Sequence, residues 1–167
     1  QTELRQMKHR LHGLRPHLPL ARLLAGHKPA RTLRDTDKMS AAPLALEAYE
    51  ALAEAYAAKI DTKPHNAFYE RPATLSLLPN VNGLDVLDAG CGPGAYAEWL
   101  LDHGARVVAL DASPKMIELA RARTRHRATF HCADLASDLP FVPDTAFDLV
   151  LAPLVLDYIA DWLAVFR

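Results

Sequence analysis

The amino-acid sequence predicts an α/β fold with a mostly parallel sheet and helices on both faces. Three observations lead to this prediction. From residue 84 onward, short apolar segments alternate with helix-forming segments, the order typical of parallel strands joined by crossover helices. Three glycines, Gly90, Gly92 and Gly94, directly follow the first apolar segment. The second and third apolar segments end at Asp111 and Asp134. Ligands of parallel sheets bind beyond such carboxyl ends, so the site has a predicted place.

The elements are predicted in the following order. A helix over 43–60 carries five residues roughly on one stripe, namely Leu44, Leu46, Tyr49, Leu52 and Tyr56. A second helix covers 66–78, until Pro79 and an Asn-Val-Asn-Gly turn end it. The predicted strands are 84–89, 106–111, 128–134 and 147–153. The helices between and after them are 96–103, 114–123 and 154–166, and Ser113 is the predicted N-cap of the second of these.

Residues 1–38 differ in composition from the rest of the chain. They contain nine Lys or Arg and three acidic residues, whereas residues 39–167 contain ten Lys or Arg and seventeen acidic residues. Glycines and prolines interrupt any long helix in 1–38, so we predict a basic, flexible leader followed by one domain over 39–167. We expect Met39 to be the natural start. The basic segment also allows a non-catalytic module that contacts nucleic acid, although the net charge of −1 makes nucleic acid an unlikely partner.

The overall composition excludes several classes of protein. No apolar run approaches the roughly 20 residues of a membrane helix, so no membrane partner is expected. Cys91 and Cys132 are the only cysteines and do not form a Cys-x-x-Cys motif, and the eight histidines show no metal-binding spacing. We therefore expect a reducing compartment, the cytoplasm, and no metal.

The glycine turn and the strand-end acids together predict a nucleoside-bearing cofactor. Asp111 can accept hydrogen bonds from both hydroxyls of a ribose, and glycines let the backbone approach a ligand closely. Two cofactors fit. A dinucleotide fits because Gly90-x-Gly92-x-x-Ala95 satisfies the loose form of the dinucleotide fingerprint, a weak signal by itself. S-adenosylmethionine (SAM) fits because Asp88 suits its cationic end, whereas it would repel a pyrophosphate. Asp134 can accept from an adenine amino group.

Four segments in order resemble the motif set of class I SAM-dependent methyltransferases. They are Val-Leu-Asp-Ala-Gly-Cys-Gly-Pro-Gly (86–94), Val-Val-Ala-Leu-Asp-Ala-Ser (107–113), His-Cys-Ala-Asp-Leu (131–135) and the segment 147–159. The likeness covers about residues 44–167 and is nearest to the branch that acts on small molecules. It implies a Rossmann-like fold and transfer of a methyl group from SAM to a small-molecule acceptor. A nicotinamide- or flavin-dependent oxidoreductase is the alternative.

The resemblance also implies which residues bind the cofactor. Asp88 and the backbone of the glycine turn would hold the methionine portion, Asp111 the ribose, and Asp134 with the Leu135 amide the adenine. Tyr49 or Tyr56 would cover the cofactor, and Arg71 would meet its carboxylate. The full predicted set is Asp88, Ala89, Gly90, Cys91, Gly92, Gly94, Asp111, Ala112, Met116, Asp134, Leu135, Tyr56 and Arg71.

The chain departs from the family pattern in two places. Asp157 stands where relatives often carry a histidine, which makes it the one candidate for a general base. The chain stops at Arg167, where relatives continue into a Pro-Gly-Gly turn and three further strands. We therefore expect a fragment in which these later strands are missing. The fourth strand would then be an exposed apolar edge through which the chain self-associates.

Overall fold

Four parallel strands form the sheet in the computed structural model, which describes residues 45–166. They are β1 (Asp85–Ala89), β2 (Arg106–Asp111), β3 (Thr129–Cys132) and β4 (Leu149–Leu151). Their spatial order is β3-β2-β1-β4, so β1 lies between β2 and β4. All four strands lie within the predicted ranges, and β3 and β4 are shorter than predicted. The predictions for residues 1–38 and Met39, and the placement of Leu44, lie outside the described residues.

Helical segments account for most of the remaining described elements. They are α2 (Leu46–Ala57), a π-helix η3 (His65–Glu70) that continues into α3 (Arg71–Ser76), α4 (Ala95–Asp102), α5 (Pro114–Arg123), a 3-10 turn η4 (Leu156–Tyr158) and α6 (Trp162–Val165). The helices predicted at 43–60, 66–78, 96–103 and 114–123 are therefore confirmed. The Ser113 cap is also confirmed, because its Oγ accepts a hydrogen bond from the Met116 amide at 3.0 Å. Leu52, one of the residues on the predicted stripe, is 59% exposed and does not join the core.

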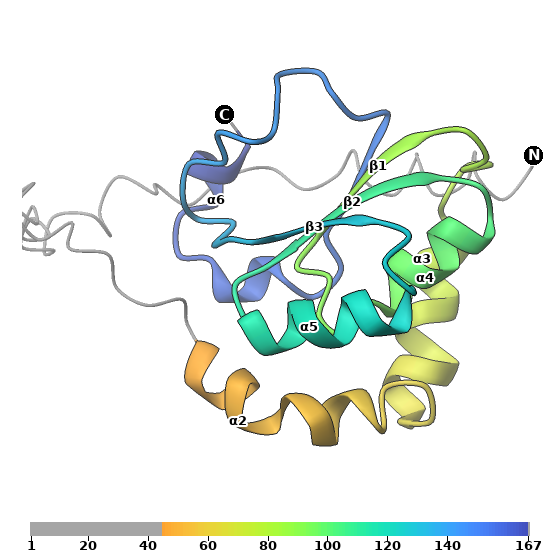
Figure 1. Cartoon of the computed structure of the whole chain (residues 1–167), viewed down its shortest axis with the longest axis vertical. Coiled ribbons are helices and arrows are strands. Elements are labelled where there is room, and N and C mark those ends of the chain that lie inside the picture. The colour runs from red at the N-terminus through yellow and green to blue at the C-terminus, as the bar shows by residue number, and fades with distance from the viewer. Residues whose placement is uncertain (1–44, 167) are drawn as a thin grey trace, which may run out of the picture. The chain divides into compact units, whose positions relative to one another are not determined.

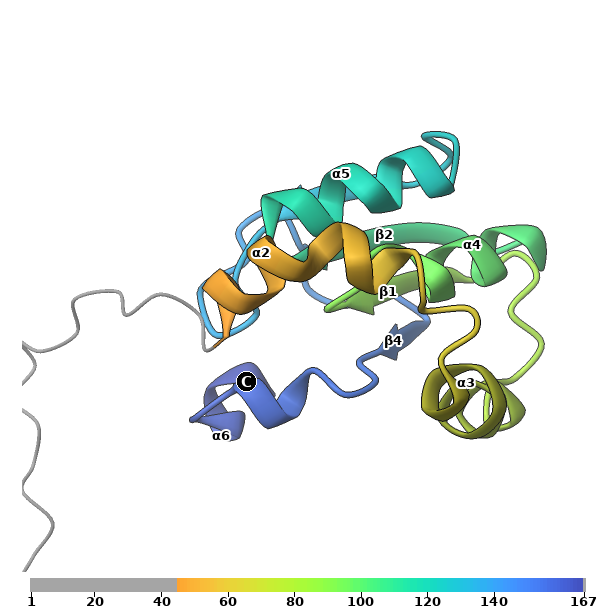
Figure 2. The same cartoon turned by 90° about the horizontal axis from the view of Figure 1, so that it is seen from below.

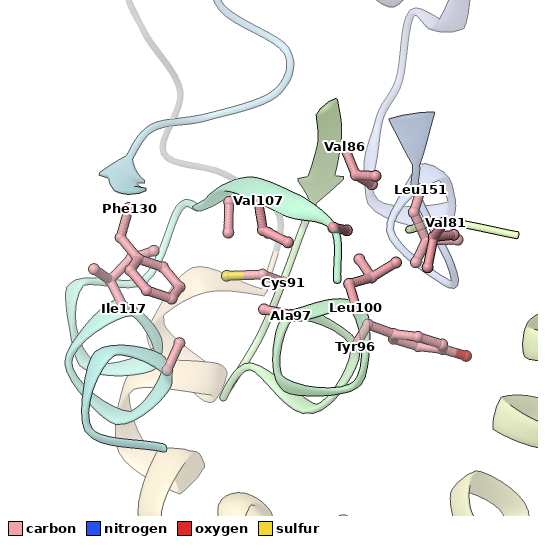
Figure 3. Close-up of a cluster of buried hydrophobic side chains, with 13 residues drawn as sticks. Val81, Val86, Cys91, Tyr96, Ala97, Leu100, Val107, Ile117, Phe130 and Leu151 are labelled. Atoms are coloured by element: carbon pink, nitrogen blue, oxygen red, sulfur yellow. The ribbon is translucent and has the colours of Figure 1, made fainter. Parts of the chain in front are cut away.

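The two faces of the sheet are covered differently. Strand alternation directs one set of side chains, including Val86, Val107 and Leu151, toward α4 and α5, where they form the larger buried cluster (Figure 3). The other set, Leu87, Ala89 and Leu110, packs against the connection between β3 and β4. Figure 1 shows this connection on the side of the sheet opposite α5. In the described residues this second face is thus covered by an irregular segment, whose two prolines disfavour a helix.

The helix predicted over 154–166 is wrong. Leu154 has a φ of 59°, in the left-handed region that an α-helix does not allow, and Ile159 is extended. Only the short η4 and α6 form there. This break keeps the segment after β4 close to the glycine turn, as described below.

The edge of the sheet and the length of the helices bear on self-association and on membrane insertion. β4 lies at an edge of the described sheet and its Val150 side chain is 58% exposed; self-association through this edge stays a prediction. None of the helices within residues 45–166 combines the length and the apolar character required to span a bilayer.

Candidate active site

A cavity of about 170 Å³ opens where the four strands end. Each strand contributes residues at or just after its end: Gly90–Pro93 after β1, Asp111–Ser113 at the end of β2, Ala133–Leu135 after β3 and Pro153–Val155 shortly after β4. Helix α2 lies beside α5 (Figure 2) and closes another wall through Leu46, Tyr49 and Tyr56. The predicted place of the site is therefore where the cavity lies.

The three glycines of the turn serve three different purposes, and all have positive φ. A Cβ on Gly90 would lie 2.5 Å from the Val155 side chain, so this glycine lets the segment after β4 approach. A Cβ on Gly94 would lie 3.0 Å from the Ala120 backbone, so this one lets α4 pack against α5. A Cβ on Gly92 would meet nothing within 4 Å, although Gly92 lines the cavity. Gly92 therefore leaves room for a ligand.

Asp111 connects the glycine turn to the start of α5. Its Oδ2 accepts a hydrogen bond from the Gly92 amide at 2.8 Å, and its Oδ1 accepts one from the Ser113 amide at 2.9 Å. Burial raises the pKa of this carboxyl, and these two amides lower it in part. A carboxylate has about four acceptor positions, so lone pairs on both oxygens are left for a ligand.

Asp88 lies beneath the turn and not in the cavity wall. It is fully buried, and neither of its oxygens has a hydrogen-bond partner among the described residues. Burial, followed by the charge of Asp111, raises its pKa to about 7, and the Ala97 backbone N–H lowers this pKa in part. Asp88 therefore does not contact the cavity and can affect the site only through its charge and its packing beneath the glycine turn.

Glu50 on α2 does not line the cavity, but it holds Ser113, which does, and the sequence analysis missed this contact. Its Oε1 accepts hydrogen bonds from the Ser113 hydroxyl at 2.5 Å and from the Lys115 amide at 3.1 Å. The bond from Ser113 is the main reason that the pKa of Glu50 is lowered. The carboxylate thus binds α2 to the N-terminus of α5, where negative charge is favourable. No local signal marks Glu50, because its partners lie more than sixty residues away.

Three tyrosines meet on the wall formed by α2 and η4. The Tyr49 and Tyr158 hydroxyls are 2.7 Å apart, and the Tyr49 ring contacts the Tyr56 and Tyr158 rings edge to face. Tyr49 and Tyr56 were predicted here, whereas Tyr158 was missed because its segment was predicted to be helical. Burial, and then the bond with Tyr158, raises the pKa of Tyr49, which keeps this hydroxyl protonated.

Arg71 lines the cavity with its guanidinium held in place. Nη1 donates to Asp61 at 2.9 Å and Nη2 donates to the Ile60 carbonyl at 3.0 Å. Asp61 also pairs with Arg123 of α5 at 2.9 Å. This network connects the segment before β1 to α5 and holds Arg71 in the cavity wall.

The cavity brings together most of the predicted cofactor-binding residues. Those that line it are Tyr56, Arg71, Gly90, Cys91, Gly92, Asp111, Ala112, Met116, Asp134 and Leu135, together with Tyr49. Asp88, Ala89 and Gly94 do not line it. Burial raises the pKa of the Cys91 thiol well above its usual value, which opposes a nucleophilic role. Lining residues that the sequence analysis missed include Asn66, Glu70, Tyr96 and Tyr158.

Asp157 is not brought to the cavity. Its side chain is exposed on η4 and is absent from the cavity wall, while its neighbour Tyr158 is part of that wall. The reason is the short 3-10 turn, which replaces the predicted helix and directs successive residues differently. The structure therefore does not support the prediction that Asp157 is a general base.

Comparison with known proteins is consistent with this geometry. Residues 87–167 match the family described as "Methyltransferase domain". The chain resembles the crystal structure of an S-adenosylmethionine-dependent methyltransferase from Mesorhizobium loti, at 36% identity over 65% of this chain and 48% of that one, with a TM-score of 0.56. It also resembles DhpI in a complex with SAH, at 32% identity over 64% of this chain and 50% of that one, with a TM-score of 0.52.

Among curated sequences, the magnesium-protoporphyrin O-methyltransferase of Rhodobacter capsulatus is 42% identical over 71 residues, which are 40% of this chain and 32% of that protein. The chain spans less than half the length of the curated relatives it matches. These matches show that residues 87–167 are similar to the methyltransferase domain family and that the fold resembles a SAM-dependent methyltransferase. They favour the methyltransferase interpretation over the dinucleotide interpretation.

Proposed function

We propose that this protein binds SAM in the cavity and transfers the methyl group to a small-molecule acceptor. The observation that carries the proposal is Asp111, which lies in the cavity wall, holds the glycine turn by the Gly92 amide, and belongs to the part of the chain that matches the methyltransferase family. DhpI, a structural relative, forms a complex with SAH, which supports the choice of cofactor. Relatives named as methyltransferases of protoporphyrin and demethylmenaquinone support a small-molecule acceptor.

The residues present fit SAM. The space beside Gly92 admits a ligand against the backbone, and Asp111 retains acceptor positions for ribose hydroxyls. Ala112, Met116 and Leu135 supply apolar surface for the adenine, and Asp134 supplies an acceptor. When bound, SAM supplies a methyl group on a positively charged sulfur, which is transferred to a nucleophile in line with the bond that breaks.

The chain itself would contribute orientation and exclusion of water. Alignment of two reactants removes much of the entropic part of a barrier, so no covalent intermediate is required. The Tyr49 and Tyr158 hydroxyls would donate and accept hydrogen bonds at the wall where the acceptor enters. Because its pKa is raised, Tyr49 acts as a donor and not as a base. Asp157 is exposed and lies outside the cavity wall, so the proposal gives it no role.

Isothermal titration calorimetry of the whole chain with SAM, and separately with NAD, tests the proposal. We expect SAM to bind and NAD not to bind. Asp111→Ala should weaken SAM binding by roughly 10- to 100-fold, because a hydrogen bond to a charged group contributes about 1.5–3 kcal/mol. Asp138→Ala is the matched control, since Asp138 is exposed and outside the cavity wall. A chain that is folded by circular dichroism and binds NAD, or binds SAM equally with and without Asp111, would contradict the proposal.

The finer expectation about location is that the protein acts in the cytoplasm. Cys91 and Cys132 are free thiols, as a reducing compartment favours. Cell fractionation with an antibody to the native protein tests this, and recovery from an oxidising compartment would contradict it.

A further inference from the structure

One part of the cavity wall is both apolar and open to solvent. Leu154 and Tyr158 follow β4, and they line the cavity while 51% and 39% exposed. Helix α2 contributes Leu46 and Tyr49, which are partly exposed and lie on one side of the helix because they are three residues apart. Exposed apolar side chains that gather around a hollow are typical of ligand-binding grooves. We call these four residues the open wall.

The two tyrosines of the open wall hold each other in place. The hydroxyl oxygens of Tyr49 and Tyr158 are 2.7 Å apart, and their rings meet at 83° with centroids 5.7 Å apart. This edge-to-face arrangement is a favourable geometry for an aromatic pair. Because both contacts fix the rings, the wall is formed before a ligand arrives, and a preformed surface loses less entropy on binding. A rigid aromatic surface is matched best by a flat aromatic ligand.

The charges of the cavity wall oppose an anionic ligand. Among the residues that the structure describes, three carboxyl groups and one guanidinium line the cavity; they belong to Glu70, Asp111, Asp134 and Arg71. The Arg71 guanidinium is already paired with Asp61, which lies outside the wall. SAM has one net positive charge, because it has a sulfonium and an ammonium group but only one carboxylate. The wall with SAM bound is therefore still negative in formal charge.

The effect of these carboxyl groups reaches the tyrosines. Burial is the main cause of the raised pKa of Tyr49 and of Tyr56, and negative charge adds to it, from Asp111 at Tyr49 and from Glu70 at Tyr56. A further negative charge is thus unfavourable at this side of the cavity, and an anionic acceptor would be repelled. A cationic acceptor would instead be repelled by the sulfonium of SAM, next to which it must react. An uncharged acceptor avoids both penalties.

We infer that the methyl acceptor is an uncharged aromatic compound whose ring packs against Tyr49, Leu154 and Tyr158 of the open wall. This inference rests on the proposed function and adds the class of acceptor to it. A hydroxyl or amino group on the ring forms the new bond to the methyl carbon. The bond between that carbon and sulfur breaks with its electron pair left on sulfur, and the proton of the hydroxyl or amino group passes to water.

Calorimetric titration with 2-naphthol and 2-naphthoate tests this inference, on the whole chain saturated with S-adenosylhomocysteine. The two probes have the same pair of rings, but at neutral pH the naphthoate carboxylate is ionised and the naphthol hydroxyl is not. We expect 2-naphthol to bind roughly 10-fold more tightly than 2-naphthoate, or better, because the wall repels the carboxylate.

Variants of the open wall test where the probe binds. Tyr158→Ala should weaken binding of 2-naphthol by roughly 2- to 10-fold, the contribution of an aromatic pair, and leave binding of S-adenosylhomocysteine unchanged. Tyr158→Phe keeps the ring and should retain binding of 2-naphthol. Tyr69→Ala is the matched control, since this tyrosine is 73% exposed and outside the cavity wall, and it should behave as wild type.

The outcomes separate this inference from the proposed function. If S-adenosylhomocysteine binds but 2-naphthol does not, or 2-naphthoate binds as tightly, the inference is wrong and the proposed function stands. If Tyr158→Ala weakens 2-naphthol and S-adenosylhomocysteine equally, or weakens neither, the open wall is not the acceptor site and the inference is also wrong. If the wild-type chain, folded by circular dichroism, does not bind S-adenosylhomocysteine, the proposed function fails and the inference fails with it.

Discussion

Replacement of the glycines one at a time should separate the folding role of the turn from its binding role. Gly92 and Gly94 both have positive φ, 52° and 85°, so alanine at either position adopts a left-handed conformation that costs about 1–2 kcal/mol. Only at Gly94 does the new Cβ also lie 3.0 Å from the Ala120 backbone, which cannot move aside as a side chain does. Overpacking of this kind typically costs a further 1–3 kcal/mol or so.

We therefore expect Gly94→Ala to lower the free energy of unfolding by about 2–5 kcal/mol, and Gly92→Ala by about 1–2 kcal/mol. Binding should show the opposite order. The Cβ at Gly92 enters the open space beside the cavity, so Gly92→Ala should weaken binding of S-adenosylhomocysteine strongly. Because Gly94 is outside the cavity wall, Gly94→Ala should change binding of S-adenosylhomocysteine little in molecules that remain folded.

Urea unfolding monitored by circular dichroism measures the free energy of unfolding, and calorimetric titration measures the affinity for S-adenosylhomocysteine. Gly83→Ala is a control for the backbone cost alone, since Gly83 has a φ of 78°, has open space at its Cβ and is outside the cavity wall. Equal losses of stability at Gly92 and Gly94, or unchanged binding by Gly92→Ala, would refute the reasoning.

Two other predictions follow from the site. Burial raises the Asp88 pKa from 3.8 to about 7, so the fold holds a proton that the unfolded chain releases, and stability should fall as pH rises through this range. Asp88→Asn should remove most of this loss of stability. Midpoints of urea unfolding at several pH values between 4 and 8 measure the effect, and a pH profile of stability that the substitution leaves unchanged would contradict the prediction. Asp111, whose pKa is also raised, accounts for a smaller remaining slope. Glu50→Ala removes the hydrogen bonds from Ser113 and Lys115 and should therefore increase amide hydrogen exchange in α2. Glu47→Ala, at an exposed position on the same helix, is the control. Equal exchange in the two variants would argue against the role of Glu50.

Local properties of the sequence were sufficient for the sheet and for much of the cavity wall. Parallel strands buried on both faces appear as apolar segments, and the glycines and strand-end acids lie next to them in the chain. The Ser113 cap was predictable for the same reason, because a cap bonds to an amide three residues away. The sequence was therefore sufficient to place Asp111, Asp134 and the glycine turn at one edge of the sheet.

Only the tertiary structure decided the contacts between distant parts of the chain. Glu50 meets Ser113 across 63 residues and Tyr49 meets Tyr158 across 109, because α2 packs against α5 and η4 returns to the cavity. The π-helix η3 has no compositional signal, and its last residue, Glu70, accepts a hydrogen bond from Tyr96 of α4, 26 residues away. Local propensity and spacing determine which elements form, whereas the side chains that share a cavity depend on how those elements pack.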